Sequence, residues 1–176
     1  MMKRFFLLVL AGFVINFCSG GEAMALELRS PSFENNGVLP ADFTCEGRDI
    51  SPELQWGNVA PNTKSFALIC DDPDAPSKVW VHWLLYNIPG EAVRLPEGIA
   101  LSKMLKDGSR QAHTDSGTDG YSGPCPPPGK PHRYFFKLYA LDSKLTINGK
   151  VTKEKLLEAM EGHILATAQL MGTYQR

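Results

Sequence analysis

The chain has 176 residues, of which 43% are hydrophobic and 21% charged, and its formal net charge is −1. This length and composition fit one globular domain that buries a core, and they exclude a largely disordered chain. Because the charge is nearly balanced, the sequence offers no basic surface for a nucleic acid or an anionic membrane, and neither is an expected partner.

The N-terminal residues have the three-part pattern of a secretory signal. Two basic residues precede an apolar run over residues 5–17, and small residues then lead to Ala25. This order is typical of a signal peptide that is cleaved on export. The sequence therefore predicts a signal peptide over residues 1–25, a single domain over residues 26–176, and a periplasmic or secreted protein.

Two other fates of this segment were weighed against cleavage. A retained membrane anchor needs about 20 apolar residues, and the run is shorter than that. Lipidation at Cys18 needs a small residue before the cysteine, where the chain has the bulky Phe17. Cleavage after Ala25 remains the favoured interpretation.

Three cysteines remain after such a cleavage, in a compartment that favours disulfides. Cys70 ends an apolar run that is typical of a buried strand, whereas Cys45 and Cys125 stand beside glycine or proline in loop-like sequence. A bond between Cys45 and Cys125 is therefore the expected one if any forms. Three separate thiols remain the alternative, since an odd number cannot all pair within one chain.

Three apolar runs rich in aromatic and β-branched residues predict strands, over residues 64–72, 79–89 and 132–141. The second and third runs are apolar on both faces, which predicts positions inside the sheets of a β-sandwich and not at an edge. Near the C-terminus the period changes from two to about 3.6. Residues 152–171 therefore predict a helix that begins at Thr152 and packs an apolar stripe on the core, formed by Leu157, Met160, Ile164, Ala168 and Met171.

An acidic turn follows the first of these strands. Asp71, Asp72 and Asp74 alternate with prolines there, so the backbone that carries the carboxylates is restricted. We expect Asp71 to lie in solvent. Asp72 and Asp74 become functional only if a proton donor, such as a histidine, lies near them.

Two histidines lie on predicted strands. By strand alternation, His82 shares a face with Leu84 and Tyr86, and His132 shares a face with Tyr134 and Phe136. A single histidine among apolar neighbours is more often a satisfied core residue than a functional group. Two on separate strands leave both interpretations open.

A loop stiffened by five prolines, "GYSGPCPPPGKP" over residues 120–131, leads directly into His132. Proline fixes the backbone and lacks an N–H, while Gly123 allows a close approach of the main chain. A small ligand is held by few contacts, so donors that are already ordered save the entropy of ordering them on binding. The loop is therefore typical of a rigid binding wall.

Four segments in this order resemble the phosphatidylethanolamine-binding protein (PEBP) family, also called Raf kinase inhibitor proteins: "DPDAP", "WVHW", "YSGPCPPPG" and "HRYFFKLYAL". The segment "FTCEGRDISPELQW" resembles its bacterial branch. The resemblance covers essentially the whole chain after the signal peptide. It implies a mostly antiparallel Greek-key β-sandwich with a few peripheral helices, and a homodimer.

The resemblance also implies a pocket for a small anion or a phosphorylated head group, with no cofactor. Eight ligand-binding residues follow from matching the motifs position by position: Asp72, Asp74, His82, Tyr121, Gly123, Pro126, His132 and Tyr134. Asp72 is expected either to orient a histidine by accepting its second ring proton or to carry a proton itself. Cys125 departs from the family pattern, because animal members have glycine there.

Three functions are compatible with these residues. The preferred one is ligand binding with a regulatory or inhibitory role and no catalysis. An inhibitor of an extracytoplasmic protease or other protein, in the periplasm or outside the cell, is one alternative. A hydrolase or metal enzyme built from Asp72, His82 and His132 is the other, and it is less favoured because Ser122 does not match the G-x-S-x-G pattern of an activated nucleophile.

Overall fold

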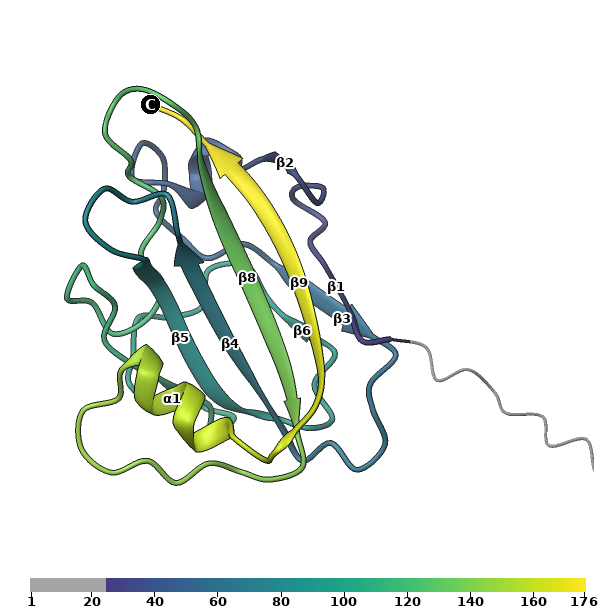
Figure 1. Ribbon diagram of the computed structural model, residues 1–176. Coiled ribbons are helices and arrows are strands. Elements are labelled where there is room, and N and C mark those ends of the chain that lie inside the picture. The colour runs from purple at the N-terminus through teal and green to yellow at the C-terminus, as the bar shows by residue number, and fades with distance from the viewer. Residues whose placement is uncertain (1–24) are drawn as a thin grey trace, which may run out of the picture.

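The computed structural model describes residues 25–176 (Figure 1), so the predicted signal peptide lies outside the described residues except for Ala25. Nine strands are present in this range: β1 (Glu27–Arg29), β2 (Gly37–Val38), β3 (Leu54–Gly57), β4 (Ser65–Asp72), β5 (Trp80–Pro89), β6 (Arg94–Leu95), β7 (Arg110–Gln111), β8 (His132–Leu141) and β9 (Ile164–Tyr174). One α-helix, α1 (Lys153–Met160), and one 3-10 turn, η1 (Ala41–Phe43), complete the described part of the chain. None of the helices in this range is long and apolar enough to span a membrane.

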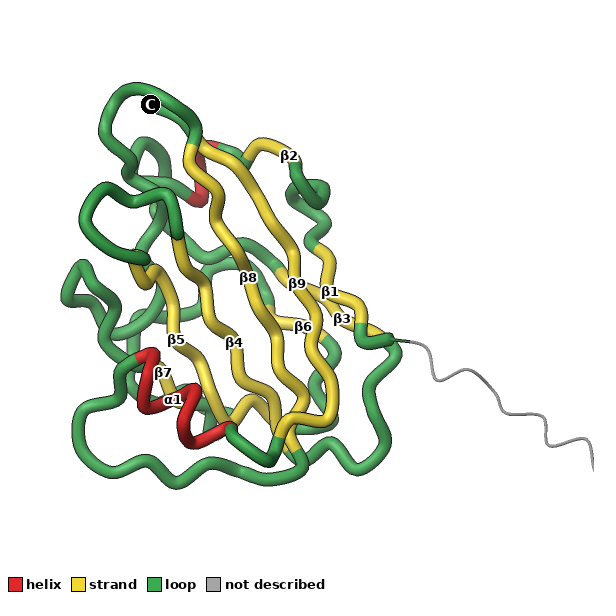
Figure 2. The backbone as a smooth tube through the Cα atoms, in the orientation of Figure 1, coloured by secondary structure: helices red, strands yellow, loops and turns green. Residues whose placement is uncertain are grey.

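The strands form two open sheets (Figure 2), and the chain is therefore mostly β. The large sheet has the order β2-β9-β8-β4-β5-β7, and the small one has the order β1-β3-β6. All pairs are antiparallel except β2 with β9. The three strands predicted from apolar runs are β4, β5 and β8, and all three lie inside the large sheet, as was expected for β5 and β8.

The main core lies between the two sheets. Trp56 on β3 packs on Phe66 on β4, with ring centroids 5.3 Å apart, and both side chains are buried. The opposite face of the large sheet is covered by α1, whose buried residues Leu156 and Met160 join a second cluster with Ile69. Every residue of β4 is buried, because this strand has a strand on each side and packing on both faces.

The predicted helix over residues 152–171 is wrong in its second half. The helix begins after Thr152, whose side chain accepts a hydrogen bond from the Lys155 N–H, but it ends at Met160. Gly162 then takes a left-handed conformation with φ 75° and turns the chain into β9, which pairs with β8 along its whole length. The helical spacing of the apolar stripe was a coincidence, because hydrogen bonding to β8 decides this segment and helix propensity does not.

Asp71 corrects a second expectation. It belongs to β4 and is fully buried, not exposed in a turn. Its carboxylate accepts hydrogen bonds from Lys137 Nζ at 2.8 and 3.0 Å and from Lys153 Nζ at 2.6 Å. Since Lys137 lies on β8 and Lys153 begins α1, this buried cluster ties the helix to the sheet.

Candidate functional site

A pocket of about 320 Å³ lies at the end of the large sheet where β4 ends and β5 and β8 begin. Six of the eight predicted ligand-binding residues line it: Asp72, His82, Gly123, Pro126, His132 and Tyr134. They come from the three central strands and from the proline loop. Elements far apart in sequence therefore build one site, as the motif order implied.

His82 reaches the pocket because β5 contains a β-bulge. Cys70 pairs with Trp83 while Asp71 pairs with Val81, so His82 is the extra residue on β5. A bulge re-aims a side chain relative to simple alternation. The predicted face was therefore wrong: His82 does not share a face with Leu84 and Tyr86.

The His82 ring lies against Tyr134 on β8, with ring centroids 5.2 Å apart in an edge-on arrangement. It is also joined twice to the proline loop. Its Nδ1–H donates to the Ser122 carbonyl at 2.7 Å, and its own carbonyl accepts from the Ser122 N–H at 2.9 Å. These bonds fix the ring, and its Nε2 has no partner in the described part of the chain.

His132 is oriented by Asp72, as expected from the sequence. Its Nδ1–H donates to Asp72 Oδ2 at 2.8 Å, and both residues are buried. The other carboxylate oxygen of Asp72 accepts from the Asp74 N–H at 2.7 Å. His132 Nε2 thereby remains as the free ring nitrogen, with no partner among residues 25–176.

The Tyr134 hydroxyl is buried and has no hydrogen-bond partner within residues 25–176. Burial raises the pKa of this hydroxyl, so it stays protonated and keeps a hydrogen to donate. Buried hydroxyls are nearly always paired. Tyr134 therefore places an unpaired donor in the lining of the pocket, beside two histidines.

Asp74 and Tyr121 were also predicted to bind the ligand, and the structure places neither on the pocket wall. Asp74 is held by the N–H, Nε and NH2 of Arg133 at 2.8–3.0 Å, and this pairing lowers the pKa of Asp74 to about 2. The buried Tyr121 hydroxyl donates to the Phe43 carbonyl at 2.7 Å. Both side chains already have strong partners, so they support the site from outside.

Gly123 lines the pocket, but it is glycine because the neighbouring segment packs too closely for a side chain. A Cβ there would lie 2.5 Å from Asp49 Oδ1 and 2.6 Å from the Phe43 carbonyl oxygen. Its N–H donates to Asp49 Oδ1 at 2.7 Å. This amide is therefore not available to a ligand, contrary to the simplest interpretation of a glycine in a binding loop.

The proline loop is also held by a disulfide. Cys45 is bonded to Cys125, which confirms the expected pair, and Cys70 is a buried free thiol. The Cys45 N–H donates to the Pro124 carbonyl at 3.1 Å beside this bond. Because Cys125 itself lines the pocket, the disulfide fixes one wall of the site.

Sequence reasoning missed the apolar part of the wall. The residues added by the structure come from the segment between β4 and β5, from the first residue of β5, from the loop with Ser116 and from the proline loop: Ala75, Pro76, Ser77, Trp80, Ser116, Ser122, Cys125 and Pro127. Trp80 and Pro127 belong to the quoted motifs "WVHW" and "YSGPCPPPG". Their sequence positions close to His82 and Pro126 could have indicated that they line the pocket. The lining therefore has a polar part formed by His82, His132 and Tyr134, called the floor below, and a largely apolar part that includes Trp80, Pro126 and Pro127, called the rim.

Burial of His82 favours its neutral form. Burial lowers the pKa of His82 below its ordinary value of 6.5, against the opposing effects of the Ser122 carbonyl and of Asp72, Asp115 and Asp49. Those three carboxylates give the region a negative potential. Their effect on the pKa is smaller than that of burial, so His82 is a neutral ring near pH 7 in the unliganded protein.

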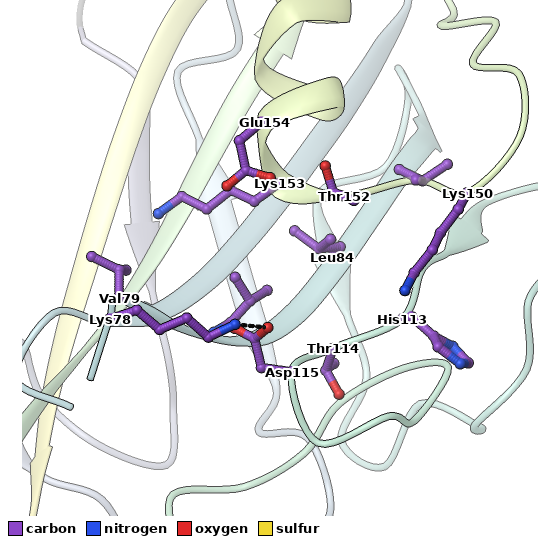
Figure 3. A pocket seen from close by; sticks show the side chains of 12 residues that line it. Lys78, Val79, Leu84, His113, Thr114, Asp115, Lys150, Thr152, Lys153 and Glu154 are labelled. Carbon is purple, nitrogen blue, oxygen red and sulfur yellow. Dashed lines mark hydrogen bonds and ion pairs between the residues drawn. The ribbon is translucent and has the colours of Figure 1, made fainter. Parts of the chain in front are cut away.

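A second hollow, of about 400 Å³, lies between α1 and the loop that carries His113 (Figure 3). Its charged side chains are largely paired: Lys78 donates to Asp115 at 2.6 Å, and Lys153 to Asp71. No buried polar side chain in the described residues points into it without a partner. We therefore take the smaller pocket with His82 and His132 as the functional site. Within residues 25–176, no group of three or more histidine, cysteine or acidic side chains is arranged to hold a metal ion.

Known proteins match the chain over nearly all of its described length. The family model described as "Phosphatidylethanolamine-binding protein" matches residues 29–175. A UPF0098 protein of Methanothermobacter thermautotrophicus is 52% identical over 151 residues, covering 86% of this chain and 99% of the relative. A UPF0098 protein of Chlamydia muridarum is 44% identical, with the same coverage of both chains.

Solved structures agree with this match. The crystal structure of a PEBP homolog, CT736, from Chlamydia trachomatis superposes with a TM-score of 0.78 at 41% identity, covering 86% of this chain and 98% of that one. Escherichia coli YbcL, described as a member of the mammalian PEBP family, gives a TM-score of 0.80 at 32% identity, covering 87% and 99%. The chain therefore belongs to the phosphatidylethanolamine-binding protein family.

Proposed function

We propose that the protein binds a small oxyanion or a phosphorylated head group in the pocket between His82, His132 and Tyr134. The observation that carries this proposal is the buried Tyr134 hydroxyl without a partner in residues 25–176. A buried polar group left unpaired costs about 1–3 kcal/mol. An oxygen atom of a ligand would accept from this hydroxyl and recover that cost.

The pocket suits a small ligand that is held at one end. Its floor offers three polar atoms, the Tyr134 hydroxyl and the Nε2 atoms of His82 and His132. Since so few contacts are available, we expect dissociation constants on the order of micromolar to millimolar for phosphate or phosphoethanolamine.

The serine hydroxyls near the pocket favour binding over hydrolysis. Ser116 Oγ donates to Ser122 Oγ at 2.6 Å, and neither hydroxyl bonds to a histidine Nε2 in the described residues. A nucleophile needs such a base to be activated. We propose a regulatory or inhibitory role through binding, and phosphoethanolamine should be recovered unchanged after incubation with the protein.

Two tyrosine variants provide a matched test of the site. Tyr134→Phe removes only the unpaired hydroxyl, so the free energy of unfolding should rise by about 0.5–1 kcal/mol while the affinity for phosphoethanolamine falls about tenfold or more. Tyr121→Phe removes a hydroxyl that is bonded to Phe43. Its stability should fall by about 1 kcal/mol with the affinity unchanged.

Urea unfolding and calorimetric titration of both variants measure these four quantities. The opposite responses separate a ligand donor from a structural hydroxyl. The proposal fails if Tyr134→Phe binds phosphoethanolamine as tightly as the natural protein does.

We also propose that the protein is exported, as the N-terminal pattern suggests. The Cys45–Cys125 bond supports this, because disulfides persist chiefly in oxidising compartments. The intact mass of the protein purified from its native cells should match residues 26–176 with one disulfide. A mass that includes residues 1–25, or a lipid on Cys18, would contradict the proposal.

A further inference from the structure

The charged side chains that line the pocket are unusual for a site that binds an anion. Among the residues that line it, none is a lysine or an arginine, and Asp72 is the one acidic residue. The cations beside lining residues are paired with carboxylates: Lys78 with Asp115 at 2.6 Å, Arg133 with Asp74 at 2.8 Å, and Arg176, whose Nη1 lies 3.7 Å from Cys125 Sγ, with Glu46 at 3.5 Å. A ligand anion therefore finds no fixed positive partner in the pocket.

The hydrogen-bond donors and acceptors of the two histidines also make the neutral pocket a poor site for an anion. His82 donates its Nδ1–H to the Ser122 carbonyl, and His132 donates its Nδ1–H to Asp72. In a neutral imidazole the other nitrogen is then an acceptor. The neutral floor therefore presents two acceptors, the Nε2 atoms, and one donor, the Tyr134 hydroxyl, while the hydroxyls of Ser77, Ser116 and Ser122 lie elsewhere in the lining.

An oxyanion cannot bind well to that arrangement. It would face two lone pairs, and its charge would add to the carboxylates near the site: Asp72 at the end of β4, and Asp49 and Asp115 on the flanking loops. Protonation of one Nε2 converts an acceptor into a charged donor and supplies the missing positive charge.

We propose that the pocket selects singly charged oxyanions carried on an apolar group, and that it takes up one proton with each ligand. This inference rests on the proposed function of the same pocket. The apolar group would lie on Trp80, Pro126 and Pro127, which form the rim next to the histidines. A doubly charged ligand leaves one charge uncompensated beside Asp72, and it binds more weakly.

His132 is the histidine that takes up the proton. Its Nδ1–H points at the Asp72 carboxylate, which stabilises an imidazolium, whereas the Nδ1–H of His82 points at a neutral carbonyl. The proton comes from solvent and binds Nε2, so the pair changes from neutral imidazole and carboxylate to imidazolium and carboxylate. Asp72→Asn keeps an acceptor for Nδ1–H but removes the stabilising charge.

Three probes separate the two parts of the proposal by calorimetric titration of the full chain. Methyl phenyl phosphate is singly charged at every pH used, phenyl phosphate is doubly charged at pH 8, and dimethyl phosphate is singly charged but lacks the ring. At pH 8 we expect methyl phenyl phosphate to bind about tenfold or more tightly than phenyl phosphate, and the difference should close at pH 5.5, where phenyl phosphate gains a proton. Dimethyl phosphate should bind more weakly than methyl phenyl phosphate at both values.

Titration of methyl phenyl phosphate in two buffers of different ionisation enthalpy counts the protons. We expect uptake close to one per ligand at pH 8 and an affinity that falls about tenfold per pH unit in that range. In Asp72→Asn the uptake at pH 8 should fall well below that of the natural protein, while Asp142→Asn, whose carboxylate bonds to the distant His163, should leave it unchanged.

The outcomes distinguish this inference from the proposed function. If none of the three probes binds at either pH, and phosphoethanolamine does not bind either, the proposed function itself fails. If the probes bind but no proton is taken up at pH 8, or if phenyl phosphate binds as tightly as its methyl ester there, the charge selection is wrong and the pocket remains an anion site.

Discussion

Replacing both Cys45 and Cys125 with serine is expected to lower the free energy of unfolding by about 4 kcal/mol. The two residues are 80 positions apart, and a bond across so long a loop removes much of the conformational freedom of the unfolded chain. The same substitution should weaken phosphoethanolamine binding, because Cys125 lines the pocket. Without the bond, the proline loop would have to be ordered when the ligand binds.

Urea unfolding and calorimetric titration, each with and without reductant, provide the measurement and its control. The natural protein under reducing conditions should resemble the double serine variant. The variant itself should not respond to reductant, since Cys70 is a buried free thiol. A reduced protein that keeps both its stability and its affinity would show that the bond does not hold the loop.

The second large effect is expected from Asp71→Asn. Asp71 is fully buried and accepts from Lys137 and Lys153, so the neutral residue leaves two ammonium groups without their shared partner. Breaking a buried pair costs 3–5 kcal/mol, and because both lysines are partly exposed we expect a loss near the lower limit, about 3 kcal/mol.

Asp142→Asn provides the matched control for this variant. Asp142 bonds to His163 at 2.8 Å, and both side chains are nearly half exposed, so the free energy of unfolding should change by less than about 0.5 kcal/mol. Urea unfolding of the two variants tests the comparison. Equal, small changes in both would mean that the cluster around Asp71 does not hold α1 on the sheet.

The three central strands could be predicted from the sequence because each is a largely apolar run, and β5 and β8 are apolar on both faces. β4, β5 and β8 lie within one residue of the predicted ranges. Such runs are buried whichever strand pairs with them, so no knowledge of the topology was needed. The two-sheet arrangement and family membership also agree with the resemblance, while the Greek-key connection and the homodimer remain predictions.

β9 and the position of His82 could not be predicted, because each depends on a neighbouring strand. β9 has helical spacing and becomes a strand through its pairing with β8. His82 reaches the pocket through a bulge that is visible only in the register between β4 and β5. Strand alternation assumes a regular register, so it placed this histidine on the wrong face.

The candidate site was predicted from the family motifs. The structure departs from that prediction where a predicted residue forms an ion pair outside the pocket. Asp74 follows the motif but is held outside the pocket by Arg133. A motif match carries no information on that pairing, because the two residues are 59 positions apart. Asp71 was misjudged for the same reason, since its lysine partners lie on β8 and α1.

The four histidines of the chain allow the most direct test of the pocket. His82 and His132 line it, whereas His113 and His163 are exposed and bond to Asp119 and Asp142 outside it. We predict that the ring signals of His82 and His132 in NMR spectra shift together when phosphoethanolamine is titrated in at constant pH, while those of His113 and His163 stay in place. If the signals of His82 and His132 do not move, or if all four histidines shift equally, the pocket is not the anion site.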